Sequence, residues 1–339
     1  SYQASPNWEL FGNYNYEERQ GTKAYGGAFF FAFAIPGFGS INELIQPVDY
    51  GTHDLNLGTY LKGDRWALNL TYTGSFFSND NDTLTWENPF FTPSLAPPPG
   101  GDFVPTQGRI DLYPDNDFNH LKGVFSYQFG NTGSWVTTVA IGQMSQDDNL
   151  VPYTISAGAG GTFPAQINYD DWNTIAALPR TSADAEINTQ LFQTKASFSP
   201  RRSLRLRAEL RYYEEDNKTQ SFETRNMQTG EVGYIVTDGG LGSTVPFEHY
   251  VFQPGVPGAP FHYRSIPFGY DQTEFKVGAD WRLNKTKLTG EIERVDTDRE
   301  HREIPTTEET TARLIAGLKY WDAAALRLPG AYSERDGSG

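Results

Sequence analysis

The side chains in this sequence that could bind ions or do chemistry are mostly oxygen ligands and histidines. Three acidic loop stretches offer oxygens of the kind that Ca²⁺ prefers: Asn79-Asp80-Asn81-Asp82, Asp115-Asn116-Asp117 and Asp147-Asp148. None has full EF-hand spacing, so solvated loops are expected there and bound Ca²⁺ is the alternative. The histidines lack a metal-binding spacing such as H-E-x-x-H. They are His53, His120, His249, His262 and His301. No Ser/His or Asp/His constellation stands out, so we expect no catalytic residues and no histidine metal site.

Composition excludes several other kinds of chemistry. The sequence contains no cysteine, which removes thiol catalysis, disulfides, Cys-ligated zinc or iron–sulfur sites and any C-x-x-C-H haem attachment. Its formal net charge is −15, and no basic stripe is present to meet phosphates. We therefore expect neither a cofactor bound by this chain nor a nucleic-acid partner.

Many of the charged side chains alternate with apolar ones. From Leu204 to Tyr212 every second residue is apolar, and the residues between them are Arg205, Arg207, Glu209 and Arg211. Period-two alternation indicates a β-strand with one apolar and one polar face. A soluble sandwich would bury the apolar face. A transmembrane barrel would turn it to lipid and turn the polar face to a wet lumen.

Similar alternation later in the chain places further charges on the polar faces of strands. Charges on that side avoid the cost of facing lipid, a few kcal/mol at the midplane. We interpret these residues as the wet lining of a lumen carrying cross-strand ion pairs; the alternative is a docking wall for a partner. The predicted lumen-facing set is Arg205, Arg207, Glu209, Arg211, Glu274, Lys276, Asp280, Arg282, Lys287, Glu291, Glu293, Arg313 and Lys319. The inward residues of 134–145 are small, namely Thr138, Ala140 and Gly142.

About eleven strands carry these faces. They are expected at 7–18, 48–61, 65–77, 117–129, 134–145, the hairpin within 185–215, 270–283, 287–295, 309–320 and from 324 to about 335. Tight turns alternate with long loops near 19–47, 78–116, 146–184 and 216–268. That parity is typical of outer-membrane barrels, which have short periplasmic turns and long outer loops. The sequence thus predicts an all-β, transmembrane, antiparallel up-and-down β-barrel in the bacterial outer membrane.

Aromatic residues provide a second indication of a membrane. Trp66, Phe129, Trp135, Trp281 and Tyr320 lie within a few residues of tight turns, whereas Tyr212 lies at the opposite strand end. Two aromatic bands fit the two interfaces of a bilayer, although aromatics also favour strands in general. An odd strand count does not suit a closed bacterial barrel, so residues 1–339 are expected to be one incomplete barrel domain.

Several stretches, in order, resemble a known family. They include 150–155 (LVPYTI), 178–182 (LPRTS), 211–213 (RYY) running into 216–219 (DNKT), 263–265 (YRS), 277–279 (VGA), 308–310 (EET) and 333–338 (SERDGS). On these the chain resembles the MtrB/PioB family of decahaem-associated outer-membrane proteins. The resemblance covers residues 117–339, and the first third only loosely. The sequence lacks the cysteine pair found near the N-terminus of many members and is shorter than the family.

The resemblance implies a wide barrel that sheathes a periplasmic multihaem c-type cytochrome. The haem chain carries electrons across the outer membrane, often to or from a second, extracellular cytochrome or a mineral. Since this chain has no cysteine for c-type haem, the electron path would belong to the partner. The alternatives are a passive porin or substrate channel, and a soluble all-β protein.

Overall fold

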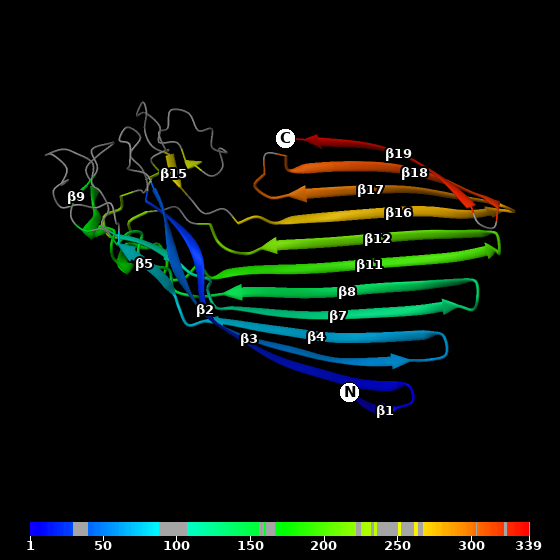
Figure 1. Ribbon diagram of the computed structural model, residues 1–339, viewed down its shortest axis with the longest axis horizontal. Helices are drawn as coiled ribbons and strands as arrows, with labels where there is room; N and C mark the ends of the chain where they lie inside the picture. The colour runs from blue at the N-terminus through cyan, green and yellow to red at the C-terminus, as the bar shows by residue number, and fades with distance from the viewer. Residues whose placement is uncertain are drawn as a thin grey trace.

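A computed structural model gives the architecture of the chain (Figure 1). The structure describes residues 1–29, 40–87, 107–155, 157, 159–160, 167–221, 225–231, 234–235, 250–251, 261–263, 267–302, 304–321 and 324–338. Its main element is a sheet of twelve strands in the order β1-β2-β3-β4-β7-β8-β11-β12-β16-β17-β18-β19, with every neighbouring pair antiparallel. The expected all-β antiparallel fold is confirmed.

The strands of this sheet occupy most of the described chain. Their bounds are β1 Tyr2–Ser5, β2 Trp8–Phe29, β3 Ser40–Lys62, β4 Trp66–Asn79, β7 Asn116–Phe129, β8 Gly133–Gln146, β11 Ala185–Arg201, β12 Leu204–Asn217, β16 Tyr270–Leu283, β17 Thr286–Arg299, β18 Thr306–Trp321 and β19 Ala324–Ser338. The count is twelve, not eleven, because the short β1 pairs with the start of β2. The odd count expected from the sequence is therefore wrong. Over the described residues the sheet is open, with β1 and β19 at its edges.

Connections alternate between short and long, as the sequence predicted. The β3–β4, β7–β8, β11–β12 and β16–β17 hairpins close over two or three residues, and Gly130 and Asn284 adopt positive φ of 59° and 52° in two of these turns. Glycine and asparagine tolerate that region best. All the short turns lie at one end of the sheet, and the long connections lie at the other (Figure 1).

Residues 19–29 and 40–47, expected in a long loop, belong instead to β2 and β3. The two strands pair continuously from Trp8 opposite Leu61 to Phe29 opposite Ser40. After Tyr16 the sequence Glu17-Glu18-Arg19-Gln20 is polar on both faces, so no apolar alternation marks it as strand. The backbone ladder continues without that signal, and the hairpin projects past its neighbours (Figure 1).

The remaining long connections contain short elements. In 78–116, β5 (Thr83–Glu87) pairs with β6 (Gln107–Asp111). In 146–184, β9 (Ala159–Gly160) pairs with β10 (Ile167–Asn168), followed by 3₁₀ turns η2 (Tyr169–Asp171) and η3 (Ile175–Ala177). In 216–268, β15 (Phe261–Tyr263) pairs with β13 (Tyr234–Ile235) and β14 (Tyr250–Val251). Among the residues the structure describes, no helix is long and apolar enough to cross a membrane.

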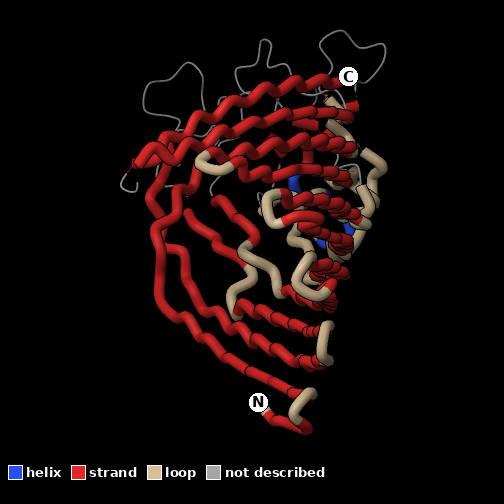
Figure 2. The backbone as a smooth tube through the Cα atoms, turned by 90° about the vertical axis from the view of Figure 1, so that its right-hand side faces the viewer, coloured by secondary structure: helices blue, strands red, loops and turns tan. Residues whose placement is uncertain are grey.

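The sheet is curved, and its two edges bend to the same side (Figure 2). Large apolar side chains on one face remain open: Ile292 is 55% and Leu314 is 60% exposed. On the other face even carboxylates are crowded, with the side chains of Glu293 and Asp280 at 14% and 17% exposure. Side chains splay apart on a convex face and converge on a concave one. The apolar face is therefore convex and the charged face concave.

No second layer covers the convex face within the described part of the chain. Among the described residues, the buried hydrophobic ones are Leu112, Ala140, Trp172, Ala177 and Leu178. Most of them lie in the loops and not on the convex face of the sheet. A soluble sandwich would bury the apolar faces of its strands against each other. Contact with lipid is the arrangement that suits an uncovered apolar face of this size.

Candidate functional site: the charged inner face

The strand register carries each face across the whole sheet. Paired residues in antiparallel strands point to the same side. Leu206 pairs with Ala279, which pairs with Gly290, which pairs with Leu314. One residue along, Arg207 pairs with Gly278, then Glu291, then Arg313. We call the concave side, to which Arg207 and its row belong, the inner face.

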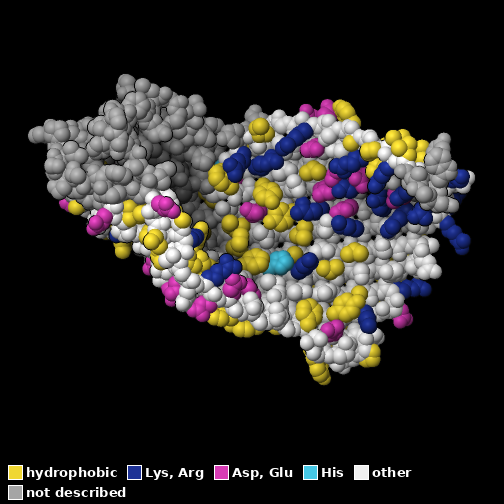
Figure 3. Space-filling view, viewed as in Figure 1, with side chains coloured by type: hydrophobic (Ala, Val, Ile, Leu, Met, Phe, Trp, Pro, Cys, Tyr) yellow, Lys and Arg dark blue, Asp and Glu magenta, His cyan; other side chains and the backbone are white. Residues whose placement is uncertain are grey.

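Twelve of the thirteen predicted lumen residues have described side chains, and all lie on the inner face by register. The side chain of Lys319 lies outside the described ones. Figure 3 views this face and shows Lys, Arg, Asp and Glu gathered over β11 to β18, beside a mainly uncharged area over β3 to β8. The inner face thus has a charged sector and a neutral sector.

The charged sector contains a continuous chain of ion pairs. Lys276 Nζ lies 2.9 Å from both Glu274 Oε1 and Glu293 Oε1. The other members link β12, β16, β17 and β18: Arg313 bonds Glu293 and Glu291, Arg207 contacts Glu291 and Asp280, and Lys287 Nζ lies 3.1 Å from Asp280 Oδ1. Four cations thus meet four carboxylates, and the network is neutral. Pairing offsets the cost of crowding these groups on a concave surface.

Glu209 belongs to a neighbouring pair that the sequence interpretation missed in part. Lys195 Nζ of β11 lies 2.8 Å from Glu209 Oε1, and Gln193 Nε2 donates to the same oxygen at 2.7 Å. Lys195 is directly opposite Glu209 in the register. The signal was available over 192–198, where Phe192, Ala196 and Phe198 alternate with Gln193, Lys195 and Ser197. Opposite charges at paired positions are expected to interact.

Three of the predicted inner-face arginines make no ion pair within the described structure. Arg205 NH2 donates to Ser197 Oγ at 3.2 Å, and Arg211 NH1 donates to Gln272 Oε1 at 3.0 Å. Arg282 is exposed and has no side-chain partner among the described residues. The structure therefore separates the predicted set into a paired network and cations that remain available.

The neutral sector is built from amides, hydroxyls and small residues. Thr73 Oγ1 donates to Asn56 Oδ1 at 2.8 Å, and Thr138, Ala140 and Gly142 lie on the same face by register. A Cβ at Gly142 would lie 2.6 Å from Thr189 Oγ1, so the wall is closely packed there. Apolar side chains also lie on this part of the inner face, which sequence analysis did not anticipate. They include Phe118, Met144, Ile187 and Leu191.

The predicted interface aromatics with described side chains lie on the convex face. Trp66, Phe129, Trp135 and Trp281 stand near the short turns and are 39–48% exposed. Trp135 Nε1 donates to Thr194 Oγ1 at 2.7 Å, which satisfies its polar edge. Tyr212, at the long-loop end, donates to Glu214 Oε2 at 3.0 Å. An apolar ring with a satisfied polar edge suits a membrane interface. The side chain of Tyr320 lies outside the described ones.

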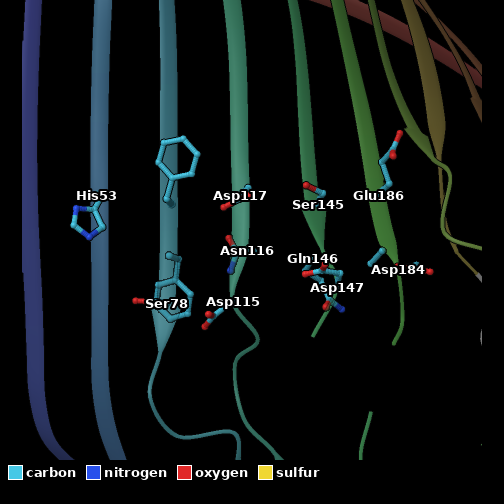
Figure 4. A pocket seen from close by; sticks show the side chains of 13 residues that line it. His53, Ser78, Asp115, Asn116, Asp117, Ser145, Gln146, Asp147, Asp184 and Glu186 are labelled. Atoms are coloured by element: carbon cyan, nitrogen blue, oxygen red, sulfur yellow. The ribbon is translucent and has the colours of Figure 1, made fainter. Parts of the chain in front are cut away.

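Two of the three acidic stretches, through Asp115, Asn116, Asp117 and Asp147, line a hollow at the long-loop end (Figure 4). Protein donors already occupy part of their oxygens: Asn79 N donates to Asp115 Oδ1 at 2.7 Å, and Asp115 N donates to Asp148 Oδ2 at 2.7 Å. Within the described residues, no group of three or more His, Asp or Glu side chains is arranged to hold a metal ion. His249 and His262 fall on side chains that are not described. The Ca²⁺ prediction gains no support from this geometry.

Two of the family-like stretches meet in an ordered contact between loops. Leu150 N donates to Thr181 O at 2.7 Å, and Tyr153 Oη donates to Arg225 O at 3.3 Å. Burial raises the pKa of the Tyr153 hydroxyl above its ordinary value. Fully buried Asn226 closes the contact, with Nδ2 donating to Asp171 O at 2.8 Å. We call 150–155 and 167–182 with 225–231 the loop clamp.

Comparison with known proteins identifies the family. The whole chain, residues 1–339, matches the family described as "Putative outer membrane beta-barrel porin, MtrB/PioB". The chain belongs to the MtrB/PioB family. It is also 27% identical over 345 residues to Outer membrane protein MtrB of Shewanella baltica (strain OS185), covering 99% of this chain and 40% of that relative. The chain thus spans less than half the length of the curated relative it matches.

Membership of the MtrB/PioB family makes this an outer-membrane protein and confirms the resemblance, the fold class and the location inferred from the sequence. Solved structures show a weaker likeness. A TodX monoaromatic hydrocarbon channel mutant aligns at 12% identity and TM-score 0.33, covering 97% of this chain and 74% of that one. OmpT of Vibrio cholerae, with loop L8 deleted, aligns at 10% identity and TM-score 0.32, covering 96% of this chain and 94% of that one. Scores this low carry no argument.

Proposed function

We propose that the whole protein is the barrel sheath of an electron conduit across the outer membrane. In this role it holds and insulates a periplasmic multihaem c-type cytochrome, and this chain supplies part of the wall. Family membership supports the proposal, since MtrB/PioB proteins are outer-membrane barrels. The observation that carries it is the inner face, which combines a neutral network of ion pairs in the charged sector with a closely packed neutral sector.

In this proposal the haem belongs to the partner. With no cysteine, this chain cannot attach c-type haem. Over the network of four cations and four carboxylates, the paired charges present little net field to what the wall encloses. Such a wall can insulate a redox chain without competing for its counter-charges. We propose no catalytic role for this chain, and an extracellular multihaem cytochrome as a second partner at the long-loop end.

The test is isolation of the full-length protein from its native membranes. A haem-staining protein should co-purify in a fixed ratio, and detergent extracts should show a c-type haem spectrum. A homogeneous, haem-free preparation would contradict the proposal. Deleting the gene for the haem protein supplies the control, since the barrel should then purify without the spectrum.

A passive porin is the second candidate, because the charged sector of the inner face is polar and the word porin stands in the description of the family. Single-channel conductance in planar bilayers separates the two functions. A sheath filled by its partner should conduct ions poorly, and removing the partner should open it. A high conductance that does not depend on any partner would favour the porin.

A further inference from the structure

A group of cations lies at the short-turn end of the charged sector. Figure 3 shows mainly dark-blue side chains at this end of the inner face. We call the group the basic rim; all of its members are exposed. They are Arg201, Arg202, Arg205, Arg282, Lys285 and Arg327.

Three of the rim arginines point to the inner face. Each stands between two residues of the apolar face: Arg205 between Leu204 and Leu206, Arg282 between Trp281 and Leu283, and Arg327 between Leu326 and Leu328. Successive side chains of a strand point to opposite sides. These guanidinium groups therefore point away from the face that contacts lipid.

Among the side chains that the structure describes, no carboxylate forms an ion pair with a member of the rim. Arg282 is paired directly with Lys287 across β16 and β17, a like-charge arrangement that destabilises a sheet. Asp280, in the row of Arg205, is already engaged by Arg207, Lys287 and the hydroxyl of Thr289. Such an excess of cations stands out in a chain of net charge −15. Local violations of pairing rules are expected at functional surfaces.

We propose that the basic rim is the docking surface for a carboxylate-rich, acidic face of the protein that enters the barrel from the periplasm. The inference rests on the proposed function. Short turns of outer-membrane barrels face the periplasm, so a periplasmic partner meets this end first. Guanidinium groups suit paired carboxylates, and a charged entrance steers an oppositely charged partner. Anionic lipid is the less suitable occupant, because the side chains of Arg205, Arg282 and Arg327 point to the inner face and away from the face that contacts lipid.

The experiment compares two triple variants of the full-length protein in its native host. The rim variant is Arg205→Gln, Arg282→Gln and Arg327→Gln. The matched control, Lys122→Gln, Arg299→Gln and Arg335→Gln, removes the same charge from the inner face outside the rim. Barrel abundance and heat-modifiable electrophoretic mobility establish that both variants fold. The readout is the haem protein retained on the immobilised barrel over increasing NaCl concentrations.

Wild type should release the haem protein as salt rises, because screening weakens charge pairs. The rim variant should retain it about tenfold more weakly at low salt and with a flatter salt dependence, while the control stays near wild type. In an Arg282→Lys variant, zero-length carbodiimide coupling should join Lys at 282 to a carboxylate of the haem protein, as identified by mass spectrometry.

The outcomes separate this inference from the proposed function. If wild type carries the haem protein and the rim variant releases it with the same salt dependence, the rim proposal is overturned and the sheath function stands. If only the bound phospholipid changes, the rim belongs to lipid and the proposal also fails. If wild type carries no haem protein, both fail.

Discussion

Arginine placed at successive depths on the convex face of β12 should measure how deeply that face lies in the membrane. Leu204 pairs with Trp281 near the turn-side interface, and Tyr212 lies near the opposite one. A strand rises about 3.3 Å per residue and tilts by about 40°, so Ala208 is about 10 Å from either level. Arginine on the lipid face costs about 2–4 kcal/mol at the midplane and about 0–1 kcal/mol near an interface.

The expected order of destabilisation is therefore Ala208→Arg, then Leu206→Arg, then Leu204→Arg. Each 1.4 kcal/mol changes the folded-to-unfolded ratio about tenfold. The Ala208→Arg variant should lose about 2–4 kcal/mol of unfolding free energy. The assay is reversible urea unfolding of the full-length protein in lipid vesicles, followed by tryptophan fluorescence and electrophoretic mobility.

Two substitutions on the inner face are the controls. Thr138→Arg places the same side chain in a wet lumen, and Arg207→Gln removes an ion pair that is 39% exposed on the arginine side. Both should cost less than about 1 kcal/mol. Equal losses from Ala208→Arg and Thr138→Arg would refute the assignment of the two faces. A depth series with no maximum at Ala208 would refute the placement of the interfaces.

Three further predictions concern the network and the loops. Arg313→Ala removes the cation that Glu291 and Glu293 share, so urea unfolding should show a loss of up to about 1 kcal/mol in unfolding free energy. Arg313→Lys should largely restore that free energy. A lysine variant as unstable as the alanine variant would count against a charge effect. Asn226→Ala removes a fully buried hydrogen-bonding side chain at a local cost of about 1–3 kcal/mol. Hydrogen exchange of the loop clamp should therefore become faster, while exchange of the sheet strands stays unchanged. Burial, and secondly the negative charge of Asp148, raises the pKa of the Asp111 carboxyl, so the folded protein binds this proton more tightly than the unfolded one. The protection of β5–β6 amides against hydrogen exchange should therefore fall as pH rises above about 4. Asp111→Asn should abolish that fall.

The membrane-spanning part of the fold could be predicted from sequence because lipid imposes alternation. Leu204 to Tyr212 and 270–283 carry that pattern, and their faces follow from it. The pattern ends where the bilayer ends. Residues 19–29 therefore looked like loop although their backbone continues the ladder, and β1 was too short to recognise.

The candidate site was predictable only in part. Alternation places Lys276, Glu293 and Arg313 on one face, but their pairing depends on register between strands. Register depends on turn lengths and bulges, which are difficult to predict from one sequence. The loop clamp gave no periodic signal, because Asn226 and Tyr153 are held by backbone contacts between segments distant in sequence.

The charged sector also bears on how the sheet reaches one alignment. A slip of two residues between β16 and β17 keeps every side chain on its face, so contact with lipid does not discriminate against it. In one direction the slip would set Glu274 opposite Glu293, and in the other it would set Asp280 opposite Glu291. The native alignment sets Lys276 opposite Glu293 instead. The inner-face charges therefore disfavour the second slip, in which Lys276 would face Val295, but not the first, in which Lys276 would face Glu291 and Asp280 would face Lys287.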